Sequence, residues 1–174
     1  MIHYASQPAF AHNQRRTSRE ELMVDVEAGL FTVAVFQNAA WAGKGIDALK
    51  QAGFPPDALS LMAKDSAESA PIFESTFGGG AERLDVVNLG AVLAKGRLVD
   101  ALQGSARDLT KLGISGTMRR VGFQPHDGRI FESLLARGGI LVAIRSDPRA
   151  ADALAILHSY GGGNAAIGAW SGRV

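Results

Sequence analysis

The chain has no cysteine among its 174 residues. This absence excludes disulfide bonds, thiolate zinc sites, iron–sulfur clusters and thiol nucleophiles. An excess of charge of either sign is also missing, because 18 Lys and Arg face 17 Asp and Glu and leave a net charge of +1. A basic excess is what attracts nucleic acids and anionic membranes. We therefore expect no nucleic-acid partner.

Long apolar runs are missing as well. The charge-free stretches are shorter than the roughly 20 residues that a membrane helix needs, or are broken by Gly and Pro, so we expect no transmembrane segment. The first residues, MIHYASQPAFAHNQRR, lack the apolar core of a secretory signal, which favours a cytoplasmic protein. Residues 1–16 are predicted to form a flexible tail, and residues 17–174 a single domain.

Signatures of catalysis and of metal binding are scarce. The histidines, His3, His12, His126 and His158, form no i, i+4 pair. The glycine run at 78–80 is not followed by Lys-Ser or Lys-Thr, so it is not a P-loop, and no nucleophile elbow or dinucleotide-binding fingerprint occurs. We expect no metal, no cofactor and no catalytic residue, although the sequence alone leaves the question of enzyme activity open.

The most informative feature present is an internal repeat. Residues 139–170 align without a gap on residues 31–62, and each segment is typical of a strand, a helix, a glycine turn and a second strand. Gly53 aligns with Gly161 at the end of the predicted helix, where a left-handed residue is favoured. The chain therefore predicts one βαβ unit used twice.

Periodicity and capping residues predict the remaining elements. Asn38 and Asp147 are the expected N-caps of the two repeat helices. The predicted strands are 30–36, 58–63, 140–145 and 165–170, and the predicted helices are 17–28, 39–52, 125–137 and 148–160.

The middle of the chain predicts a helical insert at about 81–122. Residues 64–80 are expected to be a connector, and within 81–112 apolar residues such as Leu84, Val87, Ala91 and Ala94 recur at steps of three and four. Several glycines interrupt this pattern, so the sequence leaves open whether it forms one helix or two.

These elements predict an α+β fold, a ferredoxin-like sandwich built from the two βαβ repeats (31–62 and 139–170) around the helical insert. The strands at 31–36 and 140–144 are almost wholly apolar, which indicates burial on both faces. The repeat helices cover only one face, so the insert or a second subunit must cover the other. We therefore expect a homo-oligomer.

The turns that open the repeat helices supply the candidate ligand-binding residues, because a small anion binds where a strand leads into a helix N-terminus. These candidates are Asn38, Lys44, Arg145, Ser146 and Arg149. The alternative is that Ser146 and the adjacent aspartate cap the helix and that Arg145 is merely solvated.

Two segments carry a resemblance to a known family. VAVFQNAAWAGKGIDALKQAGFPPDALSLM contains the phrase Leu49-Lys50-Gln51-Ala52-Gly53-Phe54, and RIFESLLARGGILVAIRSDPRAADALAIL runs from Arg129 to Leu157. Together they resemble the bacterial YflT-like heat-induced general stress protein domain, and the resemblance covers most of residues 31–170. It implies a stress-linked, non-catalytic role and supplies no catalytic residues.

The sequence thus leads to one main hypothesis and two alternatives. The main hypothesis is a non-enzymatic stress-associated protein that self-associates and binds a partner or small ligand. The first alternative is a small-molecule enzyme with a cleft between sheet and insert. The second is a peripheral membrane-associated protein, which would need an exposed apolar face on residues 84–112.

Overall fold

The computed structural model describes residues 30–146 and 148–163. The expectations for the tail at 1–16, the helix at 17–28, the N-cap Asp147 and the strand at 165–170 lie outside the described residues.

The described residues form a mixed α/β fold around one antiparallel sheet, whose strand order is β1-β5-β2-β4-β3. Every neighbouring pair in the sheet is antiparallel. The strands are β1 (Phe31–Phe36), β2 (Leu59–Lys64), β3 (Glu82–Val86), β4 (Gly90–Lys95) and β5 (Ile140–Arg145).

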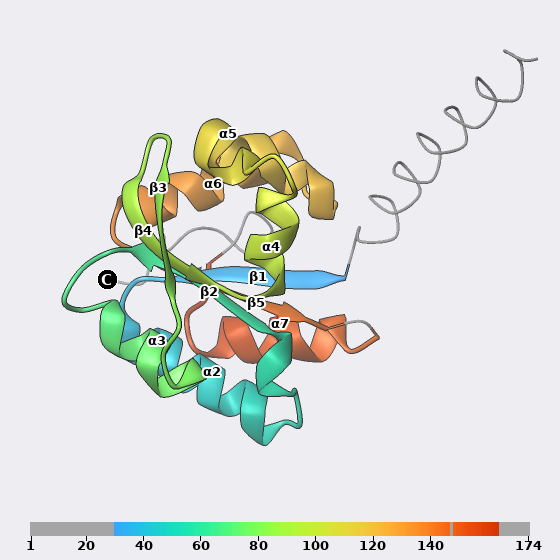
Figure 1. Ribbon diagram of the computed structural model, residues 1–174. Helices are drawn as coiled ribbons and strands as arrows, with labels where there is room; N and C mark the ends of the chain where they lie inside the picture. Colours follow the sequence, from blue (N-terminus) through green and yellow to red (C-terminus); the bar gives the residue numbers. More distant parts are fainter. Residues whose placement is uncertain (1–29, 147, 164–174) are drawn as a thin grey trace, which may run out of the picture.

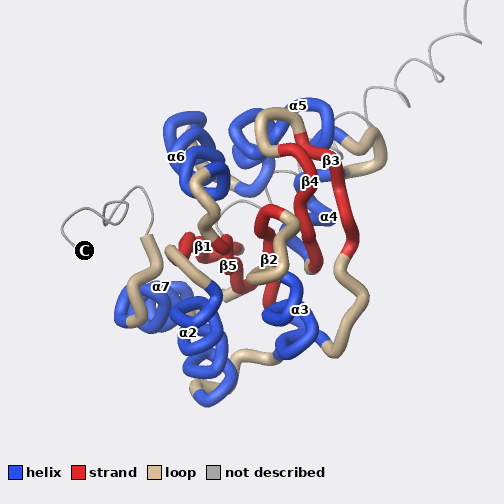
Figure 2. Tube along the Cα trace, turned by 90° about the vertical axis from the view of Figure 1, so that its left-hand side faces the viewer, coloured by secondary structure: helices blue, strands red, loops and turns tan. Residues whose placement is uncertain are grey.

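Helices cover both faces of this sheet (Figure 1), and the view turned by 90° shows the same two helical layers (Figure 2). One layer contains α2 (Ala39–Gln51), α3 (Ala70–Phe77) and α7 (Ala150–Ser159). The other contains α4 (Arg97–Gln103), α5 (Asp108–Thr117) and α6 (Pro125–Ala136), and short 3-10 turns occur at Pro56–Ala58 and Met118–Val121.

Strands β1 and β5 are almost wholly apolar because their side chains alternate between two separate cores, one on each face of the sheet. Val33 and Val35 belong to the cluster under α4, α5 and α6. Ala34 and Phe36 belong to the cluster under α2, α3 and α7. The expected burial of these strands on both faces is confirmed, and the second face is covered within one chain. The argument that led us to expect a homo-oligomer therefore no longer applies, and association stays a prediction.

The first repeat folds as a split βαβ unit. Strand β5 lies between β1 and β2 and pairs with both. After α7 the chain returns to β1, where Val35 and Gly163 exchange both backbone hydrogen bonds at 2.8 Å. The helix α2 ends as predicted, with Gly53 in the left-handed region at a φ of 93°.

The prediction of an all-helical insert was wrong. Residues 82–95 form the β3–β4 hairpin, and helices begin only at Arg97. The structure buries Leu84 and Val86 on β3 and Val92 and Ala94 on β4, which is a period of two. The apolar residues recur at steps of three and four only when they are counted as one element, although they belong to two strands. The turn between these strands contains Asn88 and Gly90, which have positive φ.

Two smaller differences concern helices near that insert and in the second repeat. Helix α3 lies within the predicted connector, with Pro71 in its first turn and Gly78 left-handed at its C-cap. Helix α7 begins at Ala150 rather than at residue 148, and the side chain of Arg149, which precedes it, makes no capping hydrogen bond.

Candidate functional site

The two turns that supplied the sequence-predicted candidates lie at opposite ends of the sheet. In the register of β1 against β5, Phe36 pairs with Ile140 and Phe31 pairs with Arg145. Five steps of about 3.4 Å therefore separate the two ends by about 17 Å. The structure does not bring Asn38 near Arg145.

Asn38 and Lys44 have local structural partners on α2. The Asn38 side chain accepts a hydrogen bond from the Trp41 backbone N–H at 3.0 Å, which confirms its role as N-cap. The Lys44 ammonium lies over the Trp41 ring, 4.6 Å from its centroid.

The second group serves the packing of the C-terminal repeat. Ser146 is buried, and its hydroxyl shares a 2.7 Å hydrogen bond with the hydroxyl of Thr32 rather than capping α7. Arg149 donates to the Ala52 carbonyl at 2.9 Å and lies over the Phe54 ring, so it fastens the C-terminal end of α2 to the start of α7. Arg145 is exposed. The proposal that these residues bind a ligand stays a prediction.

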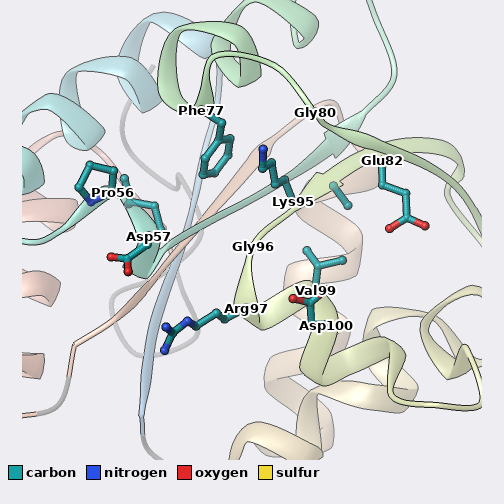
Figure 3. A pocket seen from close by; sticks show the side chains of 12 residues that line it. Pro56, Asp57, Phe77, Gly80, Glu82, Lys95, Gly96, Arg97, Val99 and Asp100 are labelled. Carbon is teal, nitrogen blue, oxygen red and sulfur yellow. The ribbon is translucent and has the colours of Figure 1, made fainter.

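A different place in the fold offers a cavity. A hollow of about 430 Å³ opens between the start of β2, the α3–β3 turn and the β4–α4 junction (Figure 3). We call it the charged hollow. Its apolar wall consists of Pro56, Leu59, Phe77, Ala94 and Val99, and its charged side chains are Asp57, Glu82, Lys95, Arg97 and Asp100.

Gly96 sets the shape of the charged hollow by turning β4 directly into α4. Its φ of 118° and ψ of 176° lie in a region that is essentially restricted to glycine. A Cβ atom here would lie 2.6 Å from the Leu59 carbonyl oxygen and from Ser60 Cα. The close approach is fixed further by a 3.0 Å hydrogen bond from the Leu98 backbone N–H to the Ser60 hydroxyl.

Two of the charged residues are held by neighbours. The Lys95 ammonium donates to the Gly79 carbonyl at 2.9 Å and lies 5.1 Å from the centroid of the Phe77 ring. Glu82 forms an ion pair with Arg107 at 3.5 Å. These contacts tie the glycine turn 78–80 to β4 and the start of β3 to α5.

The other three charged residues are Asp57, Arg97 and Asp100. All three are exposed, and none of their side chains forms a hydrogen bond or an ion pair within residues 30–146 and 148–163. In Figure 3, Asp57 and Arg97 lie on one side of Gly96, and Asp100 lies on the other. The charged hollow therefore presents one guanidinium and two carboxylates beside an apolar wall.

The ionisable groups of this lining are three carboxylates, one ammonium and one guanidinium. Its described residues include no serine, threonine, cysteine or histidine, so no hydroxyl or thiol nucleophile and no imidazole base faces the hollow. Across the described part of the chain, no group of His, Asp and Glu is placed to hold a metal ion.

Sequence reasoning missed the charged hollow because its residues come from three separate segments, 56–59, 77–82 and 94–100. The local sequence of each segment predicts only a turn or the end of a strand, and none of the three contains a ligand-binding motif. One local feature of the sequence hints at the hollow. In Lys95-Gly96-Arg97, a glycine flanked by two cationic residues follows directly after an apolar run.

Comparison of the chain with protein-family models, with curated proteins and with solved structures finds no match. The resemblance to the YflT-like domain is therefore still an expectation. None of the helices at 30–146 and 148–163 is long and apolar enough to cross a bilayer.

Proposed function

We propose that the protein is a non-enzymatic, stress-associated binding module that takes a small polar ligand in the charged hollow. The observation that carries the proposal is the set of three unpaired charges around an apolar wall. A volume of about 430 Å³ lies within the roughly 300–1,000 Å³ of small-molecule sites. Such sites combine an apolar lining with a few polar groups that orient the ligand.

The stress-associated role rests on the resemblance of residues 31–170 to the YflT-like domain. A ferredoxin-like core is part of the same proposal. It is supported by the split β1–α2–β2 unit around β5, by α7 packing in the same layer as α2, and by the return of the chain to β1 at Gly163.

Self-association also belongs to this proposal. Val87 and Leu112 are large apolar side chains that are 43% and 52% exposed. They belong to neighbouring segments, because the Val87 N–H donates to the Thr110 carbonyl at 3.1 Å. Light scattering of the full chain measures the solution mass, and a constant 18.3 kDa at every concentration would remove self-association from the proposal.

Thermal unfolding in the presence of a compound panel tests the ligand site. The panel contains the standard amino acids, dicarboxylates, sugar phosphates, nucleotides and polyamines. A ligand present at about 100 times its Kd stabilises the protein by about 2.7 kcal/mol, which raises the midpoint by about 5 to 11 °C in a chain of this length.

The variant Arg97→Trp tests where the ligand binds, because it places a large ring at the charged hollow in an exposed position. We expect it to abolish the thermal shift. Arg129→Trp, at an exposed position on α6, is the matched control and should keep the shift. The proposal fails when no compound raises the midpoint, or when Arg97→Trp keeps the full response.

A further inference from the structure

We propose that the ligand of the charged hollow is a basic amino acid, a molecule with two cationic groups and one carboxylate. This inference rests on the proposed ligand site and adds the chemical class of its occupant. It follows from the three charged residues of the hollow that lack a partner within the described chain.

The signs of these charges select the ligand. The five charged side chains of the lining, three carboxylates and two cations, sum to a net charge of −1. Asp57, Asp100 and Arg97 are the three whose charged groups have no partner in the described chain. A ligand with a net charge of +1, made of two cationic groups and one anionic group, can place an opposite charge against each of these three side chains. A basic amino acid does so with its α-ammonium, its side-chain cation and its carboxylate.

The alternatives leave at least one of these groups unmatched. A dicarboxylate or a phosphate meets one guanidinium and two repelling carboxylates. A diamine satisfies both carboxylates and leaves Arg97 without a partner. A neutral amino acid leaves one carboxylate of the lining unpaired. Arg97 is suited to the carboxylate because a guanidinium accommodates it through two parallel hydrogen bonds.

The apolar wall accommodates the aliphatic part of such a ligand. Leu59, Ala94 and Val99 border the hollow but are only 1%, 0% and 3% exposed, so the apolar surface that a ligand can reach comes from the exposed Pro56 and from Phe77. Phe77 is half-buried and its ring is part of the same wall. The methylene groups of a basic amino acid, which lie between its polar ends, can pack on the apolar wall while the polar ends meet the charged side chains beside it.

Calorimetric titration of the full chain tests the inference with four probes at one ionic strength. L-lysine carries all three groups, norleucine lacks the side-chain cation, cadaverine lacks the carboxylate, and L-glutamate reverses the side-chain charge. We expect L-lysine to bind at least about tenfold more tightly than each of the others, because each lost charge-assisted hydrogen bond weakens binding by roughly ten- to a hundredfold.

Single variants then assign the groups. Arg97→Ala should weaken L-lysine by at least about tenfold and leave cadaverine unchanged. Asp57→Asn and Asp100→Asn should each weaken L-lysine, and the double variant should bind it no better than norleucine. Asp47→Asn, an exposed carboxylate on α2, is the control and should bind as the parent does.

The outcomes separate this inference from the broader proposal. When L-glutamate, cadaverine or norleucine binds as tightly as L-lysine and Arg97→Trp abolishes that binding, the hollow is a ligand site and the basic amino acid is the wrong class. Insensitivity of L-lysine binding to both aspartate variants also overturns the inference. When no compound of the panel binds at all, both proposals fail together.

Discussion

Replacing Gly96 by alanine tests the junction on which the charged hollow depends. The new methyl group would have to share space with the Leu59 carbonyl oxygen and Ser60 Cα, each 2.6 Å from the position of Cβ. Both neighbours are backbone atoms of β2, near the centre of the sheet, and cannot rotate away. The backbone at Gly96 also has a φ of 118°, which an L-residue rarely adopts.

The expected loss of stability follows from these two effects. A non-glycine residue in this region costs about 1–3 kcal/mol. Forcing an additional carbon against a packed backbone costs a further 1–3 kcal/mol. We expect Gly96→Ala to lower the free energy of unfolding by about 4 kcal/mol, a large part of the roughly 5–15 kcal/mol of a typical domain.

Urea unfolding measures this change. With a slope of about 2 kcal/mol per molar urea, the midpoint should fall by about 2 M. Gly43→Ala is the matched control, because Gly43 lies inside α2 with no atom within 4 Å of the added carbon. It should raise stability by about 0.5–1 kcal/mol. A midpoint for Gly96→Ala within about 0.3 M of the parent would refute the argument from close packing.

Two further predictions concern the same side of the sheet. Ser60→Ala should lower the free energy of unfolding by about 1–3 kcal/mol and speed amide exchange at Leu98, because the buried Leu98 N–H loses its acceptor. The control Ser159→Ala, at an exposed position of α7, should change the free energy of unfolding by less than about 0.5 kcal/mol. Equal effects of the two serine variants in urea unfolding would contradict this. Replacing residues 82–117 by a short Gly-Ser linker should give a protein that precipitates or binds a hydrophobic dye, because it uncovers the core face that contains Val33 and Met62. Removing residues 1–16 is the control for light scattering and dye binding. If the variant that lacks residues 82–117 stays soluble and melts as cooperatively as the parent, that segment is not needed to cover this face of the sheet.

Much of the fold could be predicted where local chemistry and tertiary packing agree. Strand β5 and helices α2 and α6 lie within one residue of their predicted bounds, because apolar runs, Pro125 and Gly53 mark their ends. The β3–β4 hairpin could not be recognised in this way. Both a helical and a strand period fit its apolar residues, and the deciding fact is the left-handed backbone at Asn88, which supplies the turn.

The candidate site was less predictable than the fold. Asn38 and Arg149 were chosen because polar residues at a helix start can hold an anion, yet the structure uses them to cap α2 and to join two helices. The residues of the charged hollow become neighbours only when β4 pairs with β2 and the 78–80 turn folds back. No pattern of adjacent residues encodes those two events.

The position of β5 between β1 and β2 has a consequence for the nascent chain. Both neighbours of β5 are complete once residue 64 has been synthesised, whereas β5 ends at residue 145. At about 5–20 residues per second, translation of the intervening segment takes about 4–16 s. During that interval the chain carries two apolar strands whose shared partner has not left the ribosome, and strand edges of this kind associate readily with other chains. Until β5 is made, the edges of β1 and β2 that it will join are therefore open to pairing with other strands.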